Sequence, residues 1–128
     1  MKHGHFVWNE LVARDVENAK AFYAKTLGWT YDRMAMPNGK PYWVAKAGDT
    51  PVAGLFEMTD VMPDIPAHVP SHWFGYIEVD DVDARVKAIE AAGGRLMREL
   101  FDVPGVGRLA IVTDSVGAGI GWMTSVRK

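Results

Sequence analysis

The sequence predicts an α+β protein of two tandem βαβββ units, which form a curved mixed sheet around a central trough with the helices outside. The first observation is an internal repeat: Asp15 and Gly28 recur as Asp81 and Gly94, at a common offset of 66 residues. An offset of about half the chain favours duplication over chance. The second observation is that each repeat carries a β-forming stretch, one helical pattern and then three short strands. A helix on one face of each sheet leaves the other face uncovered, which predicts the trough.

The first unit, residues 1–57, begins with a β-forming stretch over residues 5–13. Asp15 is the predicted N-cap of the following helix, because its carboxylate can accept the exposed amides of the first turn. Gly28 is the predicted C-cap. Between them, apolar residues at helical spacing predict one buried stripe: Val16, Ala19, Phe22, Tyr23 and Leu27. Turn residues then separate three further strands, expected at 29–34, 42–47 and 51–58.

Residues 58–71 are the predicted linker between the units, either a packed connector or a lid. The segment holds three prolines, which disfavour both helix interiors and central strands. In the second unit, residues 72–128, Asp81 is expected to cap a helix that ends at Gly93 and Gly94. The strands of this unit are expected at 72–79, 95–100, 108–113 and 120–126.

Length and composition indicate one globular domain and exclude several classes of function. The 128 residues are 48% hydrophobic and 23% charged, as in ordinary globular domains. The net charge of −2 is interspersed along the chain, so no nucleic-acid or membrane partner is expected. Zero cysteines exclude disulfides and thiolate chemistry and suit a reducing compartment. No segment reads as a signal peptide or a spanning helix, and a cytoplasmic protein is expected.

Several motifs resemble those of the vicinal oxygen chelate superfamily. Asp15 is followed seven residues on by Phe22-Tyr23, and then by Leu27-Gly28-Trp29. The second half carries Asp80-Asp81-Val82-Asp83 and Gly93-Gly94 at the corresponding places. Together with the predicted architecture, these motifs resemble glyoxalase I, bleomycin-resistance proteins and extradiol dioxygenases over nearly the whole chain. Segments 8–11 and 104–108 resemble a glyoxalase-like subgroup.

The resemblance implies a divalent metal ion held by His or Glu at four strand positions. In this sequence the four positions fall on Trp8, Phe74, Leu55 and Gly121. None of these side chains offers the oxygen or imidazole ligands that such an ion needs. We therefore expect no metal and no other cofactor.

Two other metal arrangements stay open. A register slip of two residues would place Glu57 at the position assigned to Leu55. Alternatively, His3 and His5 share a strand face and would need a third ligand, such as His72 or Glu10.

The expected function is binding of a small, partly apolar or aromatic molecule between the two units. Strand alternation places Trp8 and Glu10 on one face of the first strand, and Phe74 and Tyr76 on the matching face of the fifth. Aromatic rings with a few polar groups are typical of such sites. The expected ligand-binding residues are Trp8, Trp43, Phe74, Tyr76 and Arg108. A homodimer is expected as well, because the resemblance implies paired units.

Two alternatives to simple binding remain. In the first, the protein is an enzyme: a metal-independent lyase or isomerase with Glu10 as general base, or a divalent-metal lyase or dioxygenase with displaced ligands. A purely structural role for Glu10, bonded to Arg108 or Tyr76, competes with this assignment. In the second, the protein's own side chains fill the trough, and it acts through a dimer surface.

Overall fold

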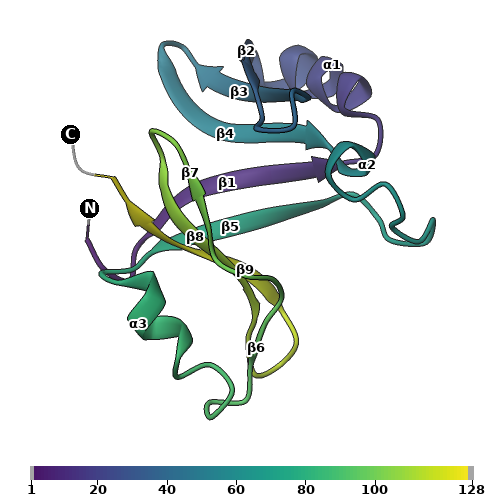
Figure 1. Cartoon of the computed structure of the whole chain (residues 1–128). Helices are drawn as coiled ribbons and strands as arrows, with labels where there is room; N and C mark the ends of the chain where they lie inside the picture. The colour runs from purple at the N-terminus through teal and green to yellow at the C-terminus, as the bar shows by residue number, and fades with distance from the viewer. Residues whose placement is uncertain (1, 127–128) are drawn as a thin grey trace. The chain divides into compact units, whose positions relative to one another are not determined.

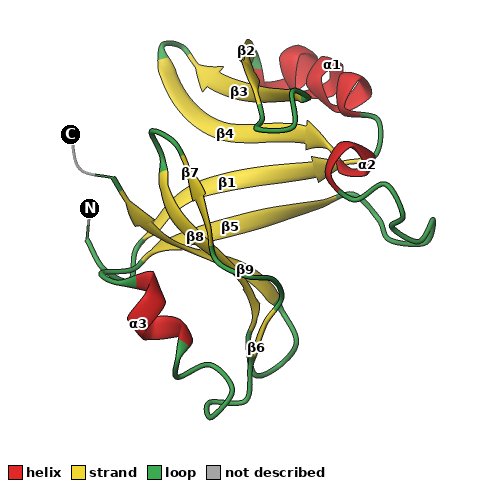
Figure 2. Cartoon of the chain, in the orientation of Figure 1, coloured by secondary structure: helices red, strands yellow, loops and turns green. Residues whose placement is uncertain are grey.

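The computed structural model describes residues 2–126 and divides into two compact units, coloured along the chain in Figure 1. The N-terminal unit contains residues 8–73, and the C-terminal unit contains residues 74–126 together with residues 2–7. Each unit combines a mixed β-sheet with helix (Figure 2). The predicted α+β class is therefore confirmed, and in each half of the chain one strand, one helix and further strands follow one another in the predicted order.

The N-terminal unit has a four-stranded sheet in the order β2-β3-β4-β1. The pairs β2/β3 and β3/β4 are antiparallel, whereas β1 and β4 are parallel. Strand β1 begins two residues before the unit does, so Phe6 and Val7 group with the C-terminal unit. The elements are β1 (Phe6–Ala13), α1 (Val16–Leu27), β2 (Thr30–Ala35), β3 (Pro41–Ala47), β4 (Thr50–Glu57) and α2 (Met58–Val61).

Helix α1 begins and ends where the sequence predicts. The Asp15 carboxylate accepts the Asn18 amide at 3.1 Å, and Gly28 closes the helix in the left-handed conformation at φ 75°. Asp15 is itself left-handed, at φ 72°, which an aspartate tolerates better than most residues. Both carboxylate oxygens of Glu57 accept amides at this turn, from Asp15 at 2.9 Å and from Val16 at 2.8 Å. The end of β4 therefore fixes the start of α1.

The core of the N-terminal unit lies between α1 and one face of its sheet (Figure 1). Ala19 and Tyr23 pack against that core as the predicted stripe requires, and Val16 is buried. The prediction is wrong for Phe22 and Leu27, which are 55% and 59% exposed. The buried members are Leu11, Ala13, Val16, Ala45, Ala53 and Leu55. The helix thus buries a narrower stripe than the spacing suggested.

The prolines of segment 58–71 predicted a segment without helix or central strand. The structure differs at its start, where the one-turn helix α2 forms. Met58 is fully buried at its start. The rest of the segment is held by the Arg14 guanidinium, which donates to the carbonyl oxygens of Val69 and Pro66, each at 2.7 Å. These contacts make the segment a packed part of the N-terminal unit.

The C-terminal unit has the sheet order β5-β9-β8-β6, and β7 also pairs with β8. Strands β5 and β9 are parallel, and the other pairs are antiparallel. Its core, on the face beside α3, consists of Val79, Val82, Ile89, Ala110 and Val112. The elements are β5 (His72–Glu78), α3 (Val82–Val86), β6 (Arg95–Leu96), β7 (Phe101–Val103), β8 (Gly107–Thr113) and β9 (Gly119–Ser125).

Two predictions for this unit are wrong in extent. Helix α3 stops at Val86 instead of reaching Gly93, because the following turns use the tighter i to i−3 pattern, as in Ile89 N–H to Val86 C=O at 3.2 Å. The strand expected at 95–100 is split into β6 and β7.

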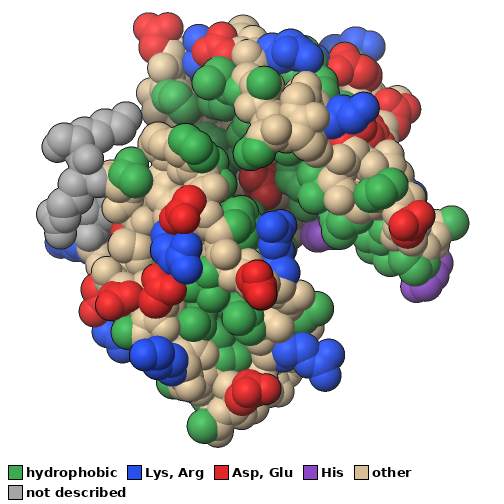
Figure 3. Space-filling model, in the orientation of Figure 1, with side chains coloured by type: hydrophobic (Ala, Val, Ile, Leu, Met, Phe, Trp, Pro, Cys, Tyr) green, Lys and Arg blue, Asp and Glu red, His purple; other side chains and the backbone are tan. Residues whose placement is uncertain are grey.

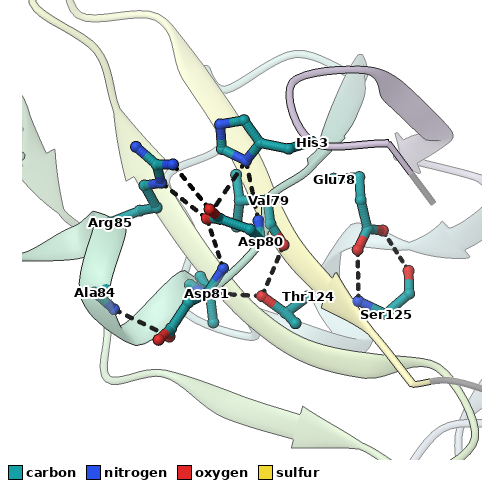
Figure 4. Close-up of polar contacts among 10 residues, drawn as sticks. His3, Glu78, Val79, Asp80, Asp81, Ala84, Arg85, Thr124 and Ser125 are labelled. Carbon is teal, nitrogen blue, oxygen red and sulfur yellow. Dashed lines mark hydrogen bonds and ion pairs between the residues drawn. The ribbon is translucent and has the colours of Figure 1, made fainter.

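The start of α3 is organised by two adjacent aspartates (Figure 4). Asp81 accepts the Ala84 amide at 3.2 Å, which confirms the predicted N-cap. Asp80 accepts two hydrogen bonds from the Arg85 guanidinium, each at 2.9 Å, and these bonds hold the pKa of Asp80 well below its usual range. The His3 ring nitrogen Nδ1 accepts the Asp80 amide at 3.0 Å.

Candidate functional site on the helix-free sheet faces

The candidate site of the N-terminal unit lies on the sheet face opposite α1. Glu10 and Val44 are both register partners of Gly54, so the three residues share a face. Because side chains alternate along a strand, Trp8, Tyr42 and Phe56 belong to that same face.

Three side chains on this face form a hydrogen-bonded chain. The Trp8 indole N–H donates to the Tyr42 hydroxyl oxygen at 2.9 Å. The Tyr42 hydroxyl in turn donates to Glu10 Oε2 at 2.8 Å. The Tyr42 ring stacks on Phe56, with centroids 6.3 Å apart and planes inclined by 23°. The result is a carboxylate held in a fixed orientation beside aromatic surface, which suits the binding of a polar group attached to an apolar body.

Glycine at position 54 is required by this arrangement. A Cβ there would lie 1.7 Å from the Tyr42 hydroxyl oxygen, because the phenol crosses directly over the Gly54 backbone. In the C-terminal unit, a tyrosine ring likewise crosses over a glycine, on β9. A Cβ on Gly121 would lie 2.2 Å from Tyr76 Cδ2. In each unit, a tyrosine ring therefore covers a glycine of the last strand.

The C-terminal unit carries its own aromatic face. Phe74 and Tyr76 make an edge-to-face contact with centroids 5.4 Å apart, so alternation along β5 brings these two predicted residues together. Glu78 shares their face and is 5% exposed. Its carboxylate accepts the Ser125 amide at 2.9 Å and also the Ser125 hydroxyl (Figure 4). These bonds compensate the burial of that charge.

Trp43 lies on the other face of the N-terminal sheet, apart from Trp8 and Glu10. It pairs with Leu55 in register and packs against the core beneath α1. The Lys20 ammonium nitrogen lies 3.1 Å from its ring centroid, a cation–π contact. The expectation that Trp43 joins the aromatic face is therefore corrected: Tyr42, its neighbour on β3, holds that place.

Arg108 is also on a helix-side face, and its donors are occupied. It lies on β8 and pairs with Thr124 on β9, which is adjacent to Met123, the register partner of Glu78 on Tyr76's face. Neighbouring residues of a strand point to opposite faces, so Arg108 is on the face opposite Tyr76. The guanidinium donates to both carboxylate oxygens of Asp83, at 2.8 and 3.1 Å, and to Asp102 at 3.1 Å. Arg108, an expected ligand-binding residue, is thus held on the helix-side face by ion pairs with Asp83 and Asp102. The hydrogen bonds from Arg108 hold the pKa of Asp83 below its ordinary value.

The residues at the four positions where the resemblance implies metal ligands do not fit a divalent ion. The register replaces Leu55 by Gly54 as the position equivalent to Gly121, since Glu10 pairs with Gly54 and Tyr76 pairs with Gly121. Leu55 itself is buried beneath α1. Neither glycine has a ligating side chain, and a tyrosine ring lies over each.

The alternative metal ligands are engaged elsewhere. Both oxygens of Glu57 cap α1. Nδ1 of His3 accepts a backbone amide, and Nδ1 of His72 lies 2.9 Å from the Pro70 carbonyl oxygen. Across residues 2–126, no three His, Asp or Glu side chains are grouped to hold a metal ion.

Tyr42 and Phe56 are the site residues that sequence reasoning missed. Both sit in predicted strands, where alternation leaves two choices of face. The signal that could have found Tyr42 is the pair Tyr42-Trp43: one ring must face the core and the other must face away. Only the register with Gly54 decides which.

Comparison with known proteins identifies the family. The sequence model of the Glyoxalase/Bleomycin resistance protein/Dioxygenase superfamily matches residues 2–122, and the chain belongs to this superfamily. It is 42% identical over 115 residues to "Putative glyoxylase CFP32" of Mycobacterium tuberculosis (strain CDC 1551 / Oshkosh), covering 90% of this chain and 42% of that protein. It is 30% identical to "Anthracycline biosynthesis protein DnrV" of Streptomyces peucetius, covering 87% of this chain and 43% of that protein. The chain thus spans less than half the length of these curated relatives.

Solved structures confirm the fold. The hypothetical protein BH1468 from Bacillus halodurans C-125 superposes with a TM-score of 0.73 at 13% identity, over 99% of this chain and 98% of that one. Methylmalonyl-CoA epimerase from Mycobacterium tuberculosis superposes with a TM-score of 0.66 at 14% identity, over 97% of this chain and 89% of that one. None of the helices within residues 2–126 has the length and hydropathy of a membrane span. On the face drawn in Figure 3, Lys and Arg side chains are interspersed with Asp and Glu side chains.

Proposed function

We propose that this chain is a metal-free member of the superfamily that binds a small, partly apolar or aromatic molecule against the helix-free face of the N-terminal unit. Trp8, Tyr42 and Phe56 supply the apolar contact surface, and Glu10 accepts a hydrogen bond from a hydroxyl or amine of the ligand. Phe74 and Tyr76 are proposed to serve the same ligand class in the C-terminal unit.

The chain of hydrogen bonds from Trp8 through Tyr42 to Glu10 is the observation that supports this proposal. Both bonds lie within the distances of good hydrogen bonds, at 2.9 and 2.8 Å. Such a chain orients the carboxylate before a ligand arrives, which lowers the entropic cost of binding. The glycine beneath Tyr42 shows that the backbone makes room for this ring.

The test is a binding screen of phenols, aryl amines and their ring-matched hydrocarbons by ligand-observed NMR. Hits are followed by titration of the wild type, Tyr42→Phe and Glu10→Gln. Both variants should weaken binding of a hydroxyl-bearing hit by about tenfold, the value of one charge-assisted hydrogen bond. Leu27→Ala, on the exposed side of α1, is the control and should bind as the wild type does. Equal affinities in all four proteins would refute the proposal.

A second candidate function is proton transfer by Glu10 as a general base in a metal-independent lyase or isomerase. The observation that favours it is the 2.8 Å hydrogen bond from Tyr42, which fixes the direction in which the carboxylate presents its oxygens. The test is exchange of an acidic C–H of a bound hit with deuterium from D₂O. Exchange that disappears in Glu10→Gln at a ligand concentration that saturates this variant would support catalysis, and exchange at the wild-type rate would contradict it.

We also propose a homodimer in the cytoplasm. The lack of cysteine suits a reducing compartment. Sedimentation of the untagged chain at several concentrations tests the dimer, and a monomer at all of them would refute it.

A further inference from the structure

A hollow of about 280 Å3 lies on the α1 side of the N-terminal unit, where β1 ends and the helix begins. Leu11 and Ala13 line it, and these residues alternate along β1 with Trp8 and Glu10. The hollow therefore opens on the face opposite the proposed ligand site. The rings of Phe22 and Tyr23 also border it.

Arg14 is the one cationic residue among those that line this hollow, and it makes no ion pair within residues 2–126. Its Nε and Nη2 donate to two carbonyl oxygens, and no carboxylate within residues 2–126 lies within 4.0 Å of it. Within residues 2–126, the Nη1 group of Arg14 has no hydrogen-bond acceptor, in contrast to Nε and Nη2. The nearby acids bind the backbone instead: Glu57 and Asp15 accept the first amides of α1.

Ser71 adds a second donor. Its Oγ accepts the Arg14 amide at 2.8 Å, and within the described chain its hydroxyl proton has no acceptor. Asn18, at the first turn of α1, also borders the hollow. The polar end of the hollow is therefore rich in donors, and its other end is aromatic.

We propose that this hollow binds a small monoanion with a single aromatic ring, an aryl carboxylate. The carboxylate accepts hydrogen bonds from Arg14 and Ser71, as arginine is suited to do, and the ring packs against Phe22 and Tyr23. A volume of about 280 Å3 lies at the small end of ligand pockets and admits one ring. The Asp15 carboxylate beside the hollow repels a dianion such as phosphate more strongly than a monoanion, because the repulsion grows with the charge of the ligand.

The test is an NMR titration of the full chain, labelled with 15N, with benzoate and with its uncharged analogue benzamide. Benzoate should shift the amides of Asn18 and Ser71 saturably, and added salt should weaken it. Benzamide should bind about tenfold more weakly or less, because it lacks the charge-assisted bonds. Equal binding of the two probes, or no saturable shift, would overturn the proposal.

Two variants and two controls sharpen the test. Arg14→Gln should reduce benzoate affinity about tenfold or more. Since Arg14 also holds segment 58–71, Phe22→Ala provides a second reading: its ring is 55% exposed, so its removal leaves the fold intact and weakens benzoate. Leu27→Ala on the same helix and Glu10→Gln on the opposite face should bind benzoate as the wild type does. Unchanged affinity in both Arg14→Gln and Phe22→Ala, or loss in Glu10→Gln, would contradict the assignment.

Discussion

At the scale of single residues, the two glycines under tyrosine rings leave no room for a Cβ while the ring stays in place. Gly121→Ala forces a Cβ to within 2.2 Å of the Tyr76 ring, which is 7% exposed and has little room to move. We expect this substitution to lower the free energy of unfolding by about 1–3 kcal/mol, the usual cost of overpacking. Urea denaturation measures it. Gly119→Ala on the same strand is the control, because its Cβ would meet only the edge of Phe74, at 3.2 Å.

Gly54→Ala should behave differently, because its Cβ meets the far end of Tyr42, which is not fully buried. The ring can swing away, and the substitution then breaks the hydrogen bonds to Trp8 and Glu10 more than it destabilises the fold. A double-mutant cycle with Tyr42→Ala isolates this effect. Gly54→Ala should cost much less stability in the Tyr42→Ala background. An equal cost in both backgrounds would show that the ring is not what requires the glycine.

The sequence predicted correctly which side chains share a face when they lie on the same strand. It did not predict which face that is, because the face depends on the register between strands. Trp8 with Glu10, and Phe74 with Tyr76, share faces because each pair lies two positions apart on one strand. Trp43 was assigned the wrong face, because nothing within β3 says which of two adjacent rings looks toward α1. That choice depends on pairing with β4, a contact between segments distant in sequence.

At the scale of elements, comparison of the N-termini of α1 and α3 distinguishes the contribution of capping from that of backbone strain. Asp15 and Asp81 both accept an amide three residues on, but Asp15 is left-handed at φ 72° whereas Asp81 is extended at φ −149°. Asp81→Ala should cost about 1 kcal/mol, the value of a cap. Asp15→Ala should cost about 1–2 kcal/mol more, because alanine is disfavoured in the left-handed region.

The glycine variants complete that prediction. Gly adopts the left-handed region freely, so Asp15→Gly should be more stable than Asp15→Ala by about 1 kcal/mol. At position 81 the backbone is extended, so glycine should have only the smaller advantage over alanine that it has at any N-cap. Thermal and urea unfolding of the four variants provide the comparison. If Ala and Gly were equivalent at position 15, the left-handed conformation would not be a source of strain.

The ion pair between Asp83 on α3 and Arg108 on β8 predicts that the stability of the fold depends on pH. Hydrogen bonds from the Arg108 guanidinium hold the pKa of Asp83 below its ordinary value. Because the folded pKa is the lower one, this stabilisation is present above the ordinary carboxyl pKa and is lost as pH falls through the folded value. Arg108→Gln should raise the pKa of Asp83 towards its ordinary value, as followed by 13C NMR of the side-chain carboxyl. Asp102→Asn is the control and should leave Asp83 nearly unchanged, since Nε and Nη2 still bind it.

Element types were predictable, and their ends were predictable only where a cap marks them. Asp15, Gly28 and Asp81 signalled three helix ends because their side chain or backbone performs the capping locally. The end of α3 was missed, since the tighter turns after Val86 follow from packing of Ile89 into the core and carry no local signal. The exposure of Phe22 and Leu27 has the same origin: helical spacing shows which residues share a face but not how wide the sheet beneath is.

At the scale of the whole molecule, most of the correct fold prediction came from the internal repeat. The repeat also caused one error, the assignment of Leu55 as the position equivalent to Gly121. The offset of 66 residues relates Trp8 to Phe74 and Glu10 to Tyr76. Between the last strands, however, the structure relates Gly54 to Gly121, an offset of 67. One additional residue in the second unit moves the equivalent position from Leu55 to Gly54. A one-residue change reverses the face of a strand, so the repeat alone could not place this part of the candidate site.

The corrected register strengthens the expectation that the chain binds no divalent metal. An ion present at 100 times its Kd would stabilise the protein by about 2.7 kcal/mol, a shift of several degrees in Tm for a domain of this size. For untagged, chelator-treated protein we expect no such shift with Ni2+, Zn2+, Mn2+ or Fe2+, and no stoichiometric metal by elemental analysis before treatment. The physical reason is that the four corresponding positions hold Trp8, Gly54, Phe74 and Gly121, none with a ligating side chain.

Glu57→Gln decides between the two ways in which that prediction could fail. If one equivalent of metal binds and raises Tm, Glu57 is the nearest carboxylate along β4, but it must first release the amides of Asp15 and Val16. The amide oxygen of glutamine keeps one acceptor for α1 and removes the charge that an ion needs. Loss of the metal-dependent shift in Glu57→Gln would therefore place the ion at the end of β4 and couple its binding to the start of α1. Persistence of the shift would place the ion elsewhere, with His3, His5 and Glu10 as the next substitutions.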